Sequence, residues 1–271
     1  MSIDTVPADD TLDWLDPGED GTWSPRVVAA EIIAANADVA AAKFVDEFGA
    51  SRTGRLALSD FSGKTRWTVG GSLVVLQCDD SSRPTLSTAD SRLPAALLDG
   101  VSPEVRSGAV RVMAVARRAG SRTKVAVATT VPGVDPVAAC VGRAHNRVDV
   151  LRATLGSEQV DVVAWHPEPA QFLVNAMQPA SISAVWIDLV KKVALVVAPD
   201  HQMSSAVGGG GLNSLLAGQL VGVAVRVIPA SKAQAVTDRL GPPQFPPPAK
   251  VENITEENDE KDPAVEQKAD M

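Results

Sequence analysis

The sequence predicts an α+β protein of three folded modules, namely a small β-barrel followed by two copies of one α+β unit. Three observations predict this class: a series of short apolar runs early in the chain, an internal repeat after it, and a glycine-containing break at the same place in each copy. The chain has 271 residues, of which 45% are hydrophobic and only 4% aromatic. A packed core is therefore available to each module, built mainly from Val, Ala, Leu and Ile.

The first module is predicted by five apolar runs that are bounded by Gly, Asp, Asn and Ser, a pattern typical of short strands. The last two runs flank a turn at residues 79–82. Five strands in about 60 residues fit a closed barrel of the OB type, and another small β-meander remains the alternative. The runs are "RVVAAEIIAA", "DVAAAKFVDEF", "GRLALSDF", "TRWTVGGSLVVLQCDD" and "RPTLST".

The rest of the folded chain is an internal repeat. Residues 93–165 and 168–230 each run helix, strand, strand, helix–break–helix, strand, and the breaks fall at Gly142 and Gly208. A repeat of this kind predicts two similar units. Each unit is expected to pack its helices on one face of a three-stranded sheet. A short helix is expected to follow, ending near Leu240.

These features divide the chain by composition as well as by pattern. Residues 1–25 carry seven acidic and no basic side chains, and residues 250–271 carry eight acidic and three basic ones. The ends therefore sum to −12 and, with a net charge of −8, the segment 26–249 is +4. A mildly basic body between acidic ends permits a nucleic-acid surface. We expect a disordered N-terminus at residues 1–25 and an OB barrel at 26–90. The two repeats are expected at residues 91–166 and 167–232, and a Pro-rich spacer with an acidic disordered tail at 233–271.

The break in the second repeat, "AVGGGGLNSLLAGQLVG", sets four glycines between two helical stretches. Glycine lets a backbone approach a ligand closely and adopt positive φ, and a helix that starts behind it points free N–H groups at an anion. This is the arrangement of the KH fold of the bacterial (type II) form, whose GXXG loop clamps single-stranded nucleic acid. A P-loop is excluded because no GK[ST] follows, and a dinucleotide loop because no strand immediately precedes the glycines.

Longer stretches resemble the transcription elongation and termination factor family NusA. "ARRAGSRTKVAVATTVPGVDPVAACVG" is similar to the first KH module of that family, and "APDHQMSSAVGGGGLNSLLAGQLVGVAVRV" is similar to the second. The resemblance covers roughly residues 26–230. It implies an S-one barrel of the OB type, RNA as ligand, and a role in elongation, pausing, termination or antitermination.

The chain departs from the family pattern at several positions. His145 replaces the second loop glycine of the first module, Gly209 replaces a loop lysine in the second, and Leu212 replaces a glutamine, while Asn213 is retained. Losing a cation weakens attraction to phosphate. The helical domain with which the family docks on RNA polymerase is expected to be missing, which makes direct docking on polymerase an open question.

The predicted partner is thus single-stranded RNA, with RNA polymerase or transcription-complex factors as further candidates. Two alternatives stay open: an RNA-binding accessory in RNA processing or translation, and a degenerate protein-interaction module that has lost RNA binding. The candidate RNA-binding residues are the two breaks with their neighbours and two basic residues after the first strand turn, namely Gly208, Gly209, Gly210, Gly211, Asn213, Gly142, Arg143, Arg147, Arg122 and Lys124.

No catalytic or metal site is predicted. The three histidines are isolated, and no Ser/His/Asp set or paired carboxylates stand in a glycine-framed context, so no enzyme activity and no cofactor are expected. The two cysteines lack CxxC spacing and are expected to be free thiols in a reducing cytosol. No run of 18 apolar residues and no secretory signal are found, so we expect a cytoplasmic location and no membrane partner.

Overall fold

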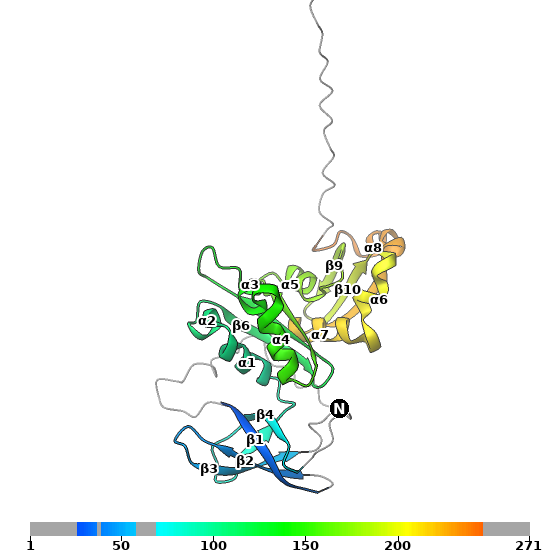
Figure 1. The fold of residues 1–271 in the computed structure, drawn as a ribbon. Helices are drawn as coiled ribbons and strands as arrows, with labels where there is room; N and C mark the ends of the chain where they lie inside the picture. The colour runs from blue at the N-terminus through cyan, green and yellow to red at the C-terminus, as the bar shows by residue number, and fades with distance from the viewer. Residues whose placement is uncertain (1–25, 37–38, 58–68, 246–271) are drawn as a thin grey trace, which may run out of the picture.

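The computed structural model describes residues 26–36, 39–57 and 69–245, which form three modules in chain order (Figure 1). The acidic segment 1–25 and the tail from residue 246, both predicted to be disordered, lie outside the described residues. The barrel lies at one end of the molecule, and the two α+β units follow it (Figure 1).

The first module is a closed five-stranded barrel, as predicted. Its strand order is β1-β2-β3-β5-β4, with β1 closing the barrel against β4 and β3 running parallel to β5. Alternate residues of β1 and β2 point inward, including Ile32 and Phe44, and the buried core is otherwise made of Ala, Val and Leu side chains. The strands are β1 (Arg26–Ala35), β2 (Val39–Val45), β3 (Ser51–Ala57), β4 (Ser72–Gln77) and β5 (Thr85–Ser87).

The first α+β unit packs its helices on one face of a three-stranded sheet. In the order β6-β7-β8, the central strand β7 is antiparallel to β6 and parallel to β8. Residues such as Leu98, Val125 and Leu151 fill the layer between helices and sheet. The elements are α1 (Leu93–Val101), α2 (Pro103–Arg106), β6 (Arg111–Arg118), β7 (Arg122–Ala128), α3 (Pro136–Val141), α4 (Asn146–Thr154) and β8 (Gln159–Ala164).

The second α+β unit repeats this plan, which confirms the internal repeat. Its sheet order is β11-β10-β9, with β10 antiparallel to β9 and parallel to β11. The elements are α5 (Pro169–Ala176), β9 (Ala184–Asp188), β10 (Val193–Ala198), α6 (Met203–Val207), α7 (Leu212–Val221) and β11 (Ala224–Pro229).

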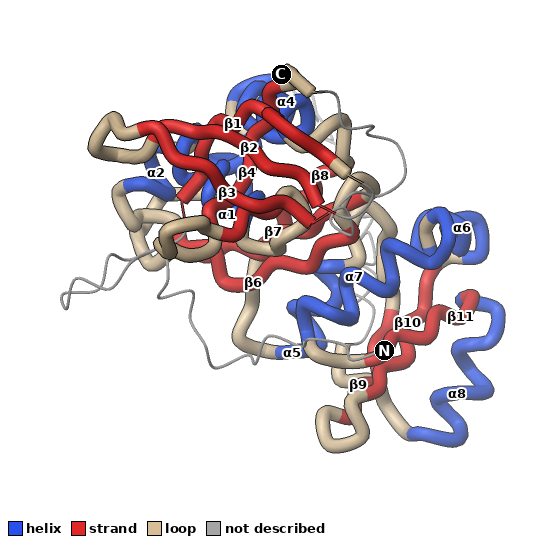
Figure 2. The backbone as a smooth tube through the Cα atoms, turned by 90° about the horizontal axis from the view of Figure 1, so that it is seen from below, coloured by secondary structure: helices blue, strands red, loops and turns tan. Residues whose placement is uncertain are grey.

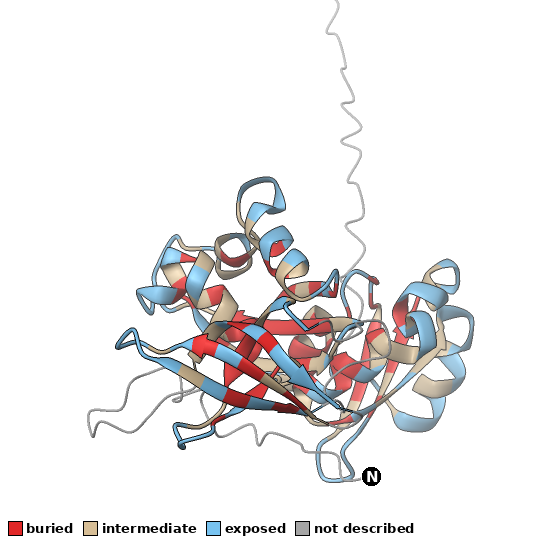
Figure 3. Ribbon diagram, turned by 60° about the horizontal axis from the view of Figure 1, so that its bottom comes forward, coloured by how far each residue is buried: buried red, intermediate tan, exposed pale blue. Residues whose placement is uncertain are grey.

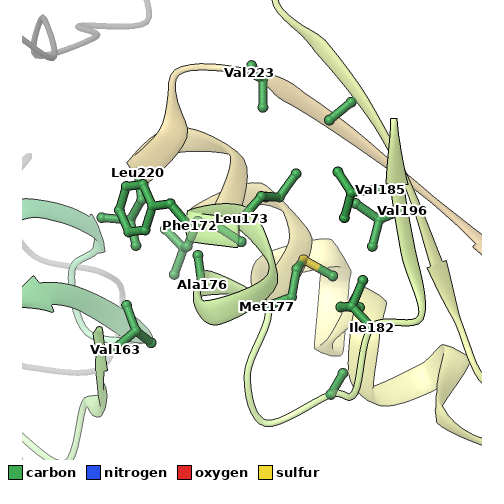
Figure 4. Close-up of a cluster of buried hydrophobic side chains, with 14 of the residues drawn as sticks. Val163, Phe172, Leu173, Ala176, Met177, Ile182, Val185, Val196, Leu220 and Val223 are labelled. Atoms are coloured by element: carbon green, nitrogen blue, oxygen red, sulfur yellow. The ribbon is translucent and has the colours of Figure 1, made fainter. Parts of the chain in front are cut away.

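The two α+β units share a hydrophobic core. Helix α7 of the second unit packs against β6 and β7 of the first and lies beside β6 in Figure 2. It covers the sheet face that carries Ala126 and Val163, whereas α1, α3 and α4 pack on the opposite face. Val163 of the first sheet joins Phe172 and Leu220 of the second unit in one buried cluster (Figure 4). The buried residues accordingly run without a gap from one unit into the next (Figure 3).

Helix α8 (Ala233–Leu240) covers part of the remaining face of the second sheet. Its Ala233 and Val236 pack on a small cluster that includes Trp186 and Ile228. The indole N–H of Trp186 donates to the Gly241 carbonyl at 2.9 Å, and the chain then pairs with β9 through Val185 and Phe245. The short helix predicted after the repeat is therefore present.

Candidate nucleic-acid interface

The glycine bend of the second unit lies between α6 and α7 and faces solvent. Gly209 and Gly210 are exposed, and the 3-10 turn Gly209–Gly211 leads directly into α7. Three of the four glycines adopt positive φ, at 77° for Gly208, 60° for Gly210 and 77° for Gly211. These angles favour glycine over any residue with a Cβ.

The bend also leaves open space where a ligand backbone could lie. A Cβ built on Gly209, Gly210 or Gly211 would meet no atom within 4 Å. By contrast, a Cβ on Gly208 would lie 2.7 Å from the backbone nitrogen of Asn213, so this position needs glycine for packing. The first N–H groups of α7 have no intrahelical partner and stand at the positive end of the helix dipole. The surface over the bend is therefore suited to an anion.

The bend of the first unit follows nearly the same backbone path with different residues. Gly142 has φ 76° and ψ 168°, against 77° and 164° for Gly208. Ala144 and His145 occupy left-handed positions with φ of 52° and 65°. A left-handed conformation costs an L-residue about 1–2 kcal/mol. Contacts elsewhere in the fold must therefore stabilise this loop in a conformation that Ala144 and His145 disfavour.

Two of the candidate residues turn out to support the loops from inside. Asn213 is fully buried, and its amide nitrogen donates to the carbonyls of Met177 at 2.9 Å and Ala206 at 3.2 Å. Its side-chain oxygen is buried without a hydrogen-bond partner among the described residues. These contacts hold the start of α7 against the ends of α5 and α6, where helix carbonyls lack intrahelical partners.

Arg147 takes the same place in the first loop, five residues after its first glycine. Its guanidinium donates to Glu104 at 2.7 Å and Ser102 at 3.4 Å, and also to the carbonyl of Ala139 in α3. The pKa of the Glu104 carboxyl is lowered, chiefly by a hydrogen bond from its own backbone N–H, and Arg147 adds to this effect. Arg147 thus positions its loop as Asn213 positions the other.

Arg122 and Lys124 lie on the sheet face that meets the second unit. Arg122 pairs with Asp161 at 2.6 Å, and the ammonium of Lys124 lies 3.3 Å from the same carboxylate and 2.8 Å from the Gln178 carbonyl. Lys124 is fully buried, and burial lowers its pKa to about 8 although Asp161 opposes the shift. Its ammonium ties the first sheet to the segment between α5 and β9 of the second unit. The predicted phosphate contact by Lys124 would require this group to leave its internal partners.

A buried ion pair joins Arg117 of β6 to Glu158, the residue before β8. The two side chains lie 3.0 Å apart and are 3% and 0% exposed. Arg117 also donates to the Asp90 carbonyl at 2.7 Å, which joins the barrel exit to the first sheet. The 41-residue separation of the partners left no local signal of the pair.

Among the candidates, Arg143 presents a cation at its bend. It is exposed, directly follows Gly142, and forms no ion pair within the described residues. The structure therefore brings together an exposed glycine bend in one unit and an exposed arginine bend in the other, each at the start of a helix.

No cluster of three or more metal-ligating side chains occurs in the part of the chain that the structure describes. Within that same part, every helix is too short or too polar to cross a membrane. Cys78 and Cys140 form no disulfide among the described residues, and the Cys78 thiol donates to Asp90 at 3.7 Å. Burial raises the pKa of Cys140 to about 12, which favours its protonated form.

Two helices around an exposed glycine-type bend, packed on a sheet with one antiparallel and one parallel neighbour pair, define a KH domain, an RNA-binding class of module. The chain carries two of them in tandem behind a barrel. Residues 89–165 match the family described as NusA-like first KH domain, and residues 169–235 match NusA-like second KH domain. The chain is a NusA-like protein.

Relatives from several bacteria carry the same name, "Transcription termination/antitermination protein NusA". The protein of Thermus thermophilus is 39% identical over 137 residues, covering 51% of this chain and 35% of the relative. That of Bacillus subtilis is 40% identical over 120 residues, covering 44% and 32%, and that of Mycobacterium tuberculosis is 39% identical over 139 residues, covering 51% and 40%. The chain thus matches between about a third and two fifths of the length of these relatives.

Proposed function

We propose that the chain binds single-stranded RNA without strong sequence preference and that the second KH bend makes the main contact. The exposed Gly209–Gly210 turn at the start of α7 is the observation that carries this proposal. Bare main-chain amides and a helix N-terminus attract phosphate oxygens whatever the base. Arg143 adds a phosphate contact from the first bend.

Within this proposal, the glycines and Arg143 touch RNA, whereas Asn213 and Arg147 act by holding the bends in shape. Gly142 and Gly208 fill positions where a Cβ would collide with the following helix. Lys124 fixes the first KH domain to the second through the Gln178 carbonyl, whereas Arg122 pairs with Asp161 inside the first KH domain. The role is binding, with no catalytic step.

By the name of its relatives, we further propose that the chain modulates transcription elongation, pausing, termination or antitermination. This role predicts co-purification with core RNA polymerase or an altered pause lifetime in a reconstituted transcription assay. An RNA-binding protein of RNA processing or translation would show neither effect while retaining RNA affinity.

The RNA-binding proposal is tested by the double variant Gly209→Asp/Gly210→Asp. Two carboxylates at the bend repel phosphate. Both positions have open space, and aspartate tolerates the left-handed φ of 60° at Gly210 better than most residues, so we expect the fold to be retained. We expect the affinity for a short uridine-rich oligonucleotide to fall at least tenfold, measured by fluorescence anisotropy at low and moderate salt.

The matched control is Ala230→Asp/Ala235→Asp, which adds the same charge at exposed positions after β11 and in α8, outside the bend and the two helices that flank it. It should change the affinity less than twofold. Equal losses in both double variants would show that net charge alone governs binding. Unchanged affinity in the bend variant would favour the protein-interaction module instead.

A further inference from the structure

The hairpin between β9 and β10 carries the most exposed large aliphatic side chain of the described residues. Val190 is 95% exposed, and its neighbours Leu189 and Val193 are 52% and 45% exposed. The equivalent turn of the first KH domain, at residues 119–121, is Ala-Gly-Ser, and the buried Glu158 holds its Gly120 N–H at 2.8 Å. The two KH domains therefore differ at this turn, which is apolar and exposed only in the second.

The turn is preorganised by hydrogen bonds. Asp188 accepts from the backbone N–H of Lys191 at 2.9 Å and pairs with the Lys191 ammonium at 3.2 Å. The carbonyl of Lys192 accepts from Ala224 at 2.8 Å, which ties the turn to β11. A turn held in this way loses little conformational freedom when a partner binds.

Cations border the apolar residues. Lys192 and Arg226 are exposed and form no ion pair within the described residues, whereas Lys191 offsets Asp188. Val193 pairs in register with Ala224, and Leu195 with Arg226, so Arg226 lies on the same sheet face as Val193. Helix α8 covers that face only around Trp186, Leu195 and Ile228. We call Leu189, Val190, Lys192, Val193 and Arg226 the hairpin patch.

An apolar surface with unpaired cations is complementary to a segment that carries apolar and acidic side chains together. The chain contains such a segment in residues 9–16, "DDTLDWLD", which sets Leu12, Trp14 and Leu15 among four aspartates. The acidic tail from residue 250 has no aromatic residue and lacks such a cluster. Tryptophan is among the side chains that dominate the binding energy of protein contacts, and the two leucines add apolar area that is buried on docking.

The segment is tethered to the folded body. Nine residues separate it from Arg26, the first residue of β1, so an extended linker spans up to about 33–36 Å. Tethering raises the local concentration of such a segment to the millimolar range, so a weak contact is sufficient. We propose that residues 9–16 dock on the hairpin patch of the second KH domain.

Zero-length carbodiimide crosslinking of the full chain tests this docking, because the reagent joins lysine to a carboxylate in direct contact. We expect Lys191 or Lys192 to crosslink to aspartates of residues 9–16, identified by mass spectrometry. The variant Leu12→Ser/Trp14→Ser/Leu15→Ser keeps all four aspartates and should lower the yield at least fivefold. The control Ile3→Ser/Val6→Ser, which removes apolar side chains just before residues 9–16, should leave the yield unchanged.

Amide hydrogen exchange gives a second readout at residues 189–193. Docking predicts slower exchange there in the full chain than in the triple variant. The proposal is overturned if the triple variant keeps the crosslinks, or if the aspartates react equally with distant exposed lysines such as Lys43. It is also overturned if a uridine oligonucleotide, added to the triple variant, protects these amides, since RNA would then be the occupant.

Discussion

The two KH bends follow one backbone path but present different chemistry to solvent. The second bend is four glycines with exposed amides, whereas the first is Gly-Arg-Ala-His with an exposed guanidinium at Arg143. The shape survives the loss of glycine because Arg147 anchors the first bend at the place where Asn213 anchors the second. Packing behind a loop can thus fix its conformation, while the loop residues decide what the loop binds.

The largest effect that separates the two bends is expected from alanine at their first glycine. In Gly208→Ala, the new Cβ would press on the backbone of Asn213 at 2.7 Å, in a residue with positive φ. We expect the free energy of unfolding to fall by about 3 kcal/mol, measured by urea denaturation. In Gly142→Ala, the new Cβ would meet the side chains of Asn146 and Arg147, which can move, so a loss of about 1–2 kcal/mol is expected.

Gly209→Ala is the control for this pair, since its Cβ meets no atom within 4 Å and its φ is not positive. It should change stability by less than about 0.5 kcal/mol. Equal losses in all three variants would mean that the bends are not held by the contacts behind them.

A smaller effect is expected from giving the second bend the cation that the first bend has. Gly209→Arg places a guanidinium in open space beside Gly210. One added phosphate contact steepens the slope of log affinity against log salt concentration by about 0.7 for single strands. This change corresponds to roughly fivefold tighter binding at 0.1 M salt. Anisotropy titrations at three salt concentrations measure both quantities. An unchanged slope would place the RNA backbone away from this bend.

The smallest effect is expected from relieving the left-handed strain of the first bend. Ala144→Gly removes a Cβ at φ 52°, which stabilises the folded state by about 1 kcal/mol. Glycine also raises the conformational entropy of the unfolded chain, which offsets part of this stabilisation. We expect a net stabilisation of roughly 0.5 kcal/mol by thermal denaturation. Ala138→Gly, in the exposed middle of α3, should instead destabilise by about 1 kcal/mol. Destabilisation by both variants would contradict the strain at Ala144.

The order of elements was predictable because each depends on nearby residues. The alternating apolar runs predicted all five barrel strands, and the matched breaks at Gly142 and Gly208 predicted two helix pairs with the observed sheet pattern. The second bend was likewise predictable, since consecutive glycines disfavour continuation of a helix and allow the positive φ that the bend adopts.

The internal roles of the polar candidates were not predictable in this way. Asn213, Arg147 and Lys124 stand beside the bends or strand turns in sequence, yet their side chains meet carbonyls and carboxylates supplied by other elements. Whether a cation faces RNA or a buried carboxylate depends on which distant residue lies opposite. Local sequence does not contain that information.

The sequence alone therefore determined the modules, their order and the two bends, because helix and strand periodicity and glycine geometry act over a few residues. Tertiary structure decided that the two KH domains share one core through Val163 and Phe172, and that Arg117 and Lys124 face inward. It also decided that α8 leaves the hairpin patch uncovered. These outcomes depend on contacts between residues far apart in the chain. The free energy of burying a charged or polar side chain depends on whether the folded structure places a partner beside it.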